Sequence, residues 1–153
     1  MRNQAAMTVH VARDAFFREN GLDTRGYEAP DFAVKVGPVT LRFRNPGLLP
    51  YHDLHHVVTG YSCDVLGEAE ISAFELRGGG VTPLIRLLSV GALAIALILA
   101  PLRVFRAWRR ARGVRSLYVL AQPYERLLEM RLDELRALCR VPARGLAEAA
   151  APG

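Results

Sequence analysis

Apolar residues recur at helical spacing in three well-separated parts of the chain. The first part covers residues 8–19 and is followed by the stop signal Asn20-Gly21. The second covers residues 65–76, and the third covers residues 123–140, after which Pro142 ends the pattern. Three amphipathic helices are therefore predicted, each with one apolar side for a shared core.

Two other stretches have different patterns. Residues 32–43 alternate between apolar and other residues on both sides of Gly37-Pro38, which predicts a β-hairpin. Residues 87–102 carry no charge, and in a helix they would span about 24 Å, against roughly 30 Å for the hydrocarbon of a bilayer. We therefore expect a mostly α protein: a single helical domain with a small β-hairpin and one hydrophobic helix.

Composition limits the class of protein only loosely. With 153 residues, of which 51% are hydrophobic, the chain is long enough for one domain with its own core. We expect this domain to cover residues 1–144 and residues 145–153 to form a disordered tail, since the tail has little to bury. The two cysteines, Cys63 and Cys139, lack the spacing of a disulfide framework, which favours a reducing compartment.

The segment 51–75 contains three of the protein's four histidines together with several carboxylates. In a helix His52 and His56 share one face, and Asp53 lies one position round. A second helix follows and carries Glu68 near its start, so folding the two helices back on each other would place Glu68 opposite the histidines. Imidazole nitrogens and carboxylate oxygens are ligands of zinc and similar divalent ions. The predicted metal ligands are His52, Asp53, His56 and Glu68.

The same residues carry a resemblance to a known family. The pattern His-Asp-x-x-His, with a glutamate after eleven further residues, resembles the motif of the coenzyme Q biosynthesis protein four family. The likeness covers roughly residues 45–141. The other residues that match are Gly60, Gly67-Glu68, Phe74-Glu75, Tyr124-Glu125 and Glu134-Leu135-Arg136.

The resemblance implies that His52, Asp53, His56 and Glu68 bind Zn²⁺. It also implies a role in ubiquinone biosynthesis, in which the protein binds a polyprenylated aromatic lipid and either decarboxylates its ring oxidatively or organises other enzymes of the pathway. The expected enzyme class is a metal-dependent lyase, and the sequence identifies no catalytic residue. The expected partners are a quinone precursor or other lipid, a second copy of the chain and other quinone-biosynthesis proteins, at the cytoplasmic side of the inner membrane.

Other assignments of the motif are possible. Glu75 is expected to accept a hydrogen bond from a ligand imidazole, Glu70 to face solvent, and His55 to neighbour the site without being a ligand.

A metal that only fastens the two helices together would make the protein a non-catalytic lipid-binding or scaffold protein. A soluble zinc hydrolase is a second alternative, although the Asp53 side chain is one methylene shorter than the glutamate of the zinc-protease motif.

Positive charge is concentrated beside the hydrophobic run. No acid occurs between residues 76 and 124, whereas eight arginines do, and the whole chain carries a net charge of +5. Arginines beside an aromatic residue at the end of an apolar helix suit an anionic bilayer surface. Residues 87–102 are compatible with a buried core helix, a short or tilted membrane segment, or a helix at the interface. The absence of a nucleic-acid-binding motif argues against a nucleic-acid partner. The residues predicted to contact a membrane or anionic lipid are Arg103, Arg106, Trp108, Arg109 and Arg110.

Overall fold

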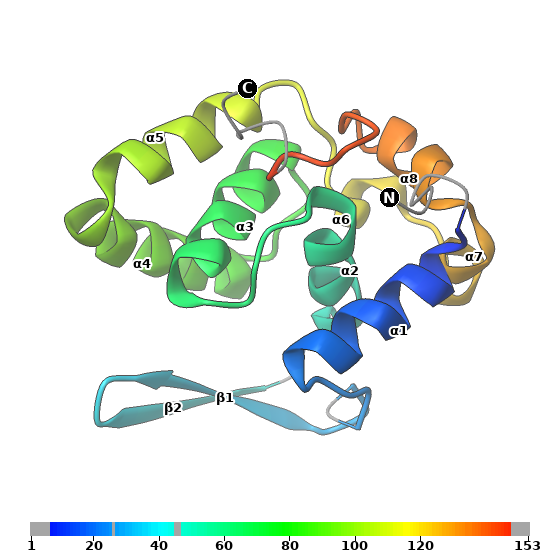
Figure 1. The fold of residues 1–153 in the computed structure, drawn as a ribbon. Helices are drawn as coiled ribbons and strands as arrows, with labels where there is room; N and C mark the ends of the chain where they lie inside the picture. The colour runs from blue at the N-terminus through cyan, green and yellow to red at the C-terminus, as the bar shows by residue number, and fades with distance from the viewer. Residues whose placement is uncertain (1–6, 26, 45–46, 148–153) are drawn as a thin grey trace.

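The computed structural model describes residues 7–25, 27–44 and 47–147 and confirms a mostly helical fold with a hairpin (Figure 1). The amphipathic pattern of residues 8–19 forms a helix that begins after Thr8 and ends at Gly21, close to its predicted bounds. The elements of the described residues are α1 (Val9–Asn20), β1 (Asp31–Val36), β2 (Val39–Arg44), α2 (Leu49–Thr59), α3 (Val65–Gly78), α4 (Pro83–Leu99), α5 (Pro101–Arg110), α6 (Leu117–Leu120), α7 (Tyr124–Glu129) and α8 (Leu132–Leu138).

The hydrophobic core lies where α1, α2, α7 and α8 meet, in the right-hand half of Figure 1. Val9 of α1, Leu54 and Val58 of α2 and Leu135 of α8 are all buried there. Helix α3 reaches the same core with Phe74 and packs on its other side against α4 and α5. Helices α2 and α3 are therefore held against each other by the core, and they are the two helices that carry the predicted metal ligands.

The helix predicted over residues 123–140 is interrupted. Met130 and Arg131 have extended backbone conformations and separate α7 from α8. Backbone hydrogen bonds to the start of the chain hold this break, because the Val9 N–H donates to the Met130 carbonyl oxygen at 2.9 Å and the Leu132 N–H donates to that of Met7 at 3.0 Å. A contact between distant parts of the chain therefore overrides the helical pattern of the sequence.

The disordered tail predicted from residue 145 onward starts too early in the sequence, because residues 145–147 pack on the domain. The Leu146 N–H donates a hydrogen bond of 2.7 Å to the carbonyl oxygen of Thr59 at the end of α2, and the Leu146 side chain is buried in the core. The preceding Gly145 has a φ of 80° and lies so close to Thr59 that a Cβ would collide with it. Residues 145–147 are thus part of the domain, whereas residues 148–153 lie outside the described residues.

Helices α4 and α5 form an outer layer beyond α3, at the left of Figure 1. The uncharged run does not form one continuous helix, since α4 ends at Leu99 and Pro101 begins α5. Of the residues of α4, Ser89 and Ala96 are buried, whereas Leu87 is 68% exposed and Ile98 is 83% exposed. The interpretation of this run as a buried core helix is therefore wrong. Among the described residues, no helix combines the length and the apolar character needed to cross a membrane.

The hairpin lies apart from the core, along the lower edge of the molecule in Figure 1. Its strands pair antiparallel, from Asp31 opposite Arg44 to Val36 opposite Val39, and Gly37 in the turn has a φ of 58°. The predicted alternation is thus realised as a two-stranded sheet. Its role in the molecule is to supply a wall to the cavity described below.

Candidate metal centre

Helix α2 directs His52 and His56 toward α3. Pro50 lies in the first turn of this helix, and Gly60, with a φ of 79°, ends it. The side of α2 that carries Leu54 is buried in the core. Because the helix cannot turn without exposing that side, core packing fixes the direction of both imidazoles.

Helix α3 supplies Glu68 from its first turn. The Asp64 carboxylate caps the helix by accepting a hydrogen bond of 2.7 Å from the Gly67 N–H. A Cβ on Gly67 would collide with the carbonyl oxygen of Ser62, so only glycine allows the loop and the first turn to approach this closely. Cap and glycine together set the position of the neighbouring Glu68.

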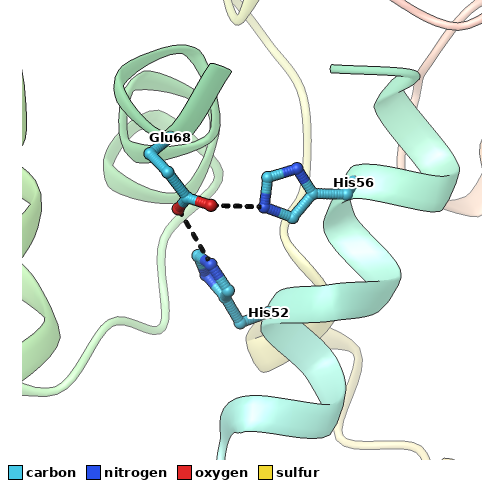
Figure 2. A group of neighbouring side chains, drawn as sticks. All are labelled: His52, His56 and Glu68. Carbon is cyan, nitrogen blue, oxygen red and sulfur yellow. Dashed lines mark hydrogen bonds and ion pairs between the residues drawn. The ribbon is translucent and has the colours of Figure 1, made fainter. Parts of the chain in front are cut away.

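The three side chains converge on one point, as Figure 2 shows. The Nε2 atom of His52 lies 3.2 Å from one Glu68 oxygen, and that of His56 lies 3.3 Å from the other. All three ligand atoms lie within 4.8 Å of one another. Bonds of about 2.0–2.2 Å to a tetrahedral zinc ion place ligand atoms roughly 3.4 Å apart, so the spacing suits such an ion. His52, His56 and Glu68 could hold a metal ion.

The second nitrogen of each imidazole is occupied by an acceptor. The Nδ1 of His52 lies 2.9 Å from the Glu75 carboxylate, and the Nδ1 of His56 lies 3.1 Å from the carbonyl oxygen of Tyr61. Metal-bound histidines usually donate their other N–H to a carboxylate or a carbonyl group, which fixes the ring and the tautomer. Both Nε2 atoms are therefore presented to the shared point.

Glu75 connects the site to the rest of the protein. Its Oε1 atom also lies 2.8 Å from the Nδ1 of the buried His55 and accepts a 2.8 Å hydrogen bond from the Tyr118 hydroxyl. The Nε2 of His55 in turn accepts a hydrogen bond from the Leu117 N–H at 2.9 Å, so its proton resides on Nδ1. Burial lowers the pKa of His55, which is neutral and fastens α2 to α6.

Two carboxylates set the charge of His52. Burial alone would lower the pKa of His52, but hydrogen bonds to Glu68 and Glu75 outweigh burial and raise it well above its usual value. Burial opposes, without overcoming, the hydrogen bonds to His52 and His56 that lower the pKa of Glu68 to about 2. Without a metal His52 is therefore protonated at neutral pH, and a cation that binds its Nε2 must displace that proton.

Asp53, the fourth predicted ligand, lies outside this group of three ligands. It accepts a 2.7 Å hydrogen bond from the Tyr27 hydroxyl, and burial raises the pKa of its carboxyl group. The physical reason is helix geometry, because a residue that follows His52 directly is turned about 100° away from the face shared with His56. The structure thus groups three of the four predicted ligands.

A cavity of about 660 Å³ opens beside the ligands. His52, Glu68 and Glu75 line it, and most of the other lining residues are apolar. These apolar walls come from the hairpin, from α3 and from α4, with Leu41, Phe43, Val65, Leu88, Ala92 and Ile95 among them. The site therefore joins a polar end, where the three side chains could hold a cation, to an apolar compartment.

Two of the predicted lipid-contact residues on α5 have partners within the protein. Arg103 forms an ion pair of 2.7 Å with Glu70. Glu70 is buried, so the expectation that it faces solvent is wrong. The Arg77 guanidinium lies 5.0 Å from the centre of the Trp108 ring. Glu70 was misassigned because, among the described residues, the arginine that pairs with it lies 33 residues further along the sequence.

The other three predicted lipid-contact residues are less constrained. Arg109 lies 5.8 Å from the centre of the exposed Phe105 ring on the same helix. Arg106 and Arg110 line a second cavity together with Arg103. The arginine cluster is therefore divided between an outer face of α5 and an inner one.

Comparison with known proteins yields no further assignment: no family model, curated protein or solved structure matches this chain. The assignment of the site therefore depends on its own geometry. Two members of that geometry, Tyr118 and the Leu117 N–H, were missed by sequence reasoning. They lie 43 residues from Glu75 and 62 from His55, and no spacing rule connects residues so far apart.

Proposed function

We propose that the protein binds Zn²⁺ through His52, His56 and Glu68 and acts in ubiquinone biosynthesis on a polyprenylated aromatic lipid. The coenzyme Q biosynthesis protein four family, which the motif resembles, supplies the reaction class. The observation that supports it most is the joining of the ligand group to an apolar cavity of about 660 Å³. An aromatic head with oxygen substituents suits the polar end, and an isoprenoid chain suits the apolar walls.

Each part of the site has a task in this proposal. Three protein ligands leave a coordination position open, as in catalytic zinc sites, and a bound Zn²⁺ would polarise a carboxylate or phenol oxygen of the ring. Glu75 holds the His52 ring in its ligand orientation. The apolar side chains that line the cavity orient the lipid and exclude water from the ring.

The cavity can be tested on one helix with a matched pair of variants. Ala92 lines the cavity, whereas Ala94 of the same helix is exposed and is not among the lining residues. We expect Ala92→Phe to abolish the copurification of a lipid that mass spectrometry detects with the parent protein and with Ala94→Phe. If both variants carry the same lipid as the parent, the cavity is not the lipid site.

The metal is tested separately by Glu68→Gln and His52→Ala. Elemental analysis should show loss of zinc in both, and neither should restore quinone levels in a strain that lacks the gene. Glu129→Gln, which changes an exposed glutamate of α7, is the control that should keep both properties. If the two site variants lose zinc but keep their fold and restore quinone levels, the metal has a structural role and the protein is not a metal-dependent enzyme.

We further propose that the outer face of α4 and α5 rests on an anionic membrane at the cytoplasmic side. The exposed apolar residues of this face are Leu87, Val90, Leu97, Ile98, Leu99, Leu102 and Phe105. Leu87 also lines the cavity, so a lipid could pass from the bilayer into the site without crossing water. An exposed apolar face of this extent, with arginines nearby and no acid between residues 76 and 124, favours an anionic lipid surface over a protein partner.

The membrane proposal is tested by flotation with vesicles that contain phosphatidylglycerol. Ile98→Glu removes an apolar side chain that is 83% exposed, and burying such a side chain in lipid contributes about 1.5–3 kcal/mol, or roughly tenfold or more in binding. Val11→Glu, an equally polar change at an exposed site of α1, should leave flotation unchanged. Equal flotation of parent and Ile98→Glu would refute the assignment of this face.

A further inference from the structure

A second cavity, of about 360 Å³, is separate from the metal centre. It is bounded by α5, by the loop that joins α2 to α3, by Glu70 and by Ala147. Glu70 follows Glu68 by two residues and therefore lies on the opposite side of α3. The cavity thus has its own surroundings, and none of its lining residues belongs to the three metal ligands.

Positive charge dominates this cavity. Arg103, Arg106 and Arg110 follow one another at spacings of three and four residues, so they share one face of α5. Arg103 is neutralised by its ion pair with the buried Glu70. Neither Arg106 nor Arg110 forms an ion pair with a carboxylate of the described residues. The lining therefore holds two cations more than it holds anions.

Among the described residues, a buried hydroxyl group that lines the same cavity lacks a hydrogen bond of good geometry. Tyr61 is 2% exposed, and its hydroxyl oxygen makes no contact of hydrogen-bond geometry with the described residues. Burial raises the pKa of Tyr61 to about 12, and the charge of Glu70 adds to this rise, whereas hydrogen bonding to Arg110 and its positive charge oppose it. Buried polar groups almost always have a well-formed hydrogen bond, so a hydroxyl group without one, beside two arginines that lack a carboxylate partner, points to a site for an anionic ligand.

We propose that this cavity binds a phosphate group through the side chains of Arg106, Arg110 and Tyr61. Guanidinium groups form paired hydrogen bonds with phosphate oxygens, and a hydroxyl group can donate to a third oxygen. The excess of two positive charges matches a phosphate dianion better than a single carboxylate. Arg103 and Glu70 hold α5 against α3 and so set the width of the cavity.

Inorganic phosphate is the probe, titrated by calorimetry at constant ionic strength with chloride as the comparison. We expect saturable binding of one phosphate per chain, weakened roughly tenfold or more by Arg106→Gln, Arg110→Gln and Tyr61→Phe, since each removes a hydrogen bond to a charged ligand. Arg109→Gln, on the same helix but outside the cavity, is the control and should bind like the parent. Circular dichroism and zinc content, unchanged in all variants, show that the fold and the metal centre are intact.

Two results would overturn the proposal: the parent shows no saturable binding at millimolar phosphate, or the three cavity variants bind as tightly as Arg109→Gln. Tyr61→Phe is the most informative variant. If the Tyr61 hydroxyl group binds a water molecule and not phosphate, removing it leaves phosphate binding unchanged. The source of the phosphate follows from a second arm with phosphatidylglycerol vesicles. If millimolar phosphate releases bound vesicles and chloride of equal ionic strength does not, the ligand is a lipid headgroup; if vesicle binding persists, it is a soluble phosphate.

Discussion

Replacing Glu75 by glutamine removes one buried negative charge and leaves a side chain of nearly the same shape. The Oε1 atom of Glu75 meets three groups, the Nδ1 atoms of His52 and His55 and the Tyr118 hydroxyl, at distances of 2.8–2.9 Å. An amide oxygen at this place can still accept hydrogen bonds, but it no longer increases the basicity of the His52 ring. The variant therefore separates the orientation of the ligand from its electrostatic support.

The expected sizes of the two effects differ. Changing an outer acceptor of a metal-bound histidine costs about 10–100-fold in metal affinity, or about 1.4–2.8 kcal/mol. For folding, a hydrogen bond to a charged group contributes about 1 kcal/mol more than a neutral one, so three of them add up to about 3 kcal/mol. Relief from burying the Glu75 charge offsets part of this loss. We therefore expect zinc affinity to fall 10–100-fold while the free energy of unfolding of the metal-free protein falls by at most about 3 kcal/mol.

Competition with a chromophoric chelator measures the zinc affinity, and urea denaturation followed by circular dichroism measures the stability. Glu75→Ala is the contrasting change, because it leaves the donors of His55 and Tyr118 without an acceptor and should destabilise the protein more than Glu75→Gln does. Glu129→Gln controls for the loss of a surface charge. If Glu75→Gln binds zinc as tightly as the parent while Glu68→Gln does not bind it, the role assigned to Glu75 is wrong.

Three other predictions concern stability. In the metal-free protein the folded pKa of His52 is raised, so the stabilisation that His52 contributes is complete below pH 6.5 and is lost as pH rises through the folded pKa. The folded pKa of Glu68 is lowered, so the stabilisation that Glu68 contributes is complete above pH 4.5 and is lost as pH falls to about 2. Urea denaturation at a series of pH values tests both. Gly67→Ala should destabilise the protein by more than 1 kcal/mol on the scale of overpacking, since its Cβ collides with the Ser62 carbonyl oxygen, and a thermal melt equal to that of the parent would contradict this. Arg136→Met should cost about 3 kcal/mol or more, because the buried Arg136 donates to three backbone carbonyl oxygens, and urea denaturation measures the loss.

Local patterns in the sequence were sufficient for the elements that depend on local physics. Thr8 and Gly21 mark the two ends of α1, and the alternating pattern around Gly37 forms the hairpin. The pairing of His52 and His56 with Glu68 was also predictable, because helical spacing aligns the histidines and a short loop brings the next helix back. For each of these features, the residues that decide the structure lie close together in the chain.

The features that were missed depend on residues far apart in the chain. The break between α7 and α8 depends on the backbone hydrogen bonds that Val9 donates and Met7 accepts, and the burial of Leu146 depends on Thr59. Periodicity describes how one segment presents its side chains and contains no information about which distant backbone group will meet them. For a related reason the sequence left open whether residues 87–102 are buried in protein or face a membrane, since an uncharged helix has the same pattern in both cases.

The position of Asp53 bears on which kind of metal site the group of His52, His56 and Glu68 could form. Residue 53 is turned about 100° from the face that His52 and His56 share, and in the structure α2 is regular and the Asp53 carboxylate accepts a hydrogen bond from Tyr27. With Asp53 held there, the described residues would offer a metal ion three ligands, and two of these, His52 and Glu68, line the apolar cavity. A site closed by four protein ligands would only fasten two helices together, whereas a site with three can also bind an oxygen atom of a molecule in the cavity. By holding the Asp53 carboxylate away from the group, the hydrogen bond from Tyr27 favours the proposed enzyme over a scaffold with a closed metal site.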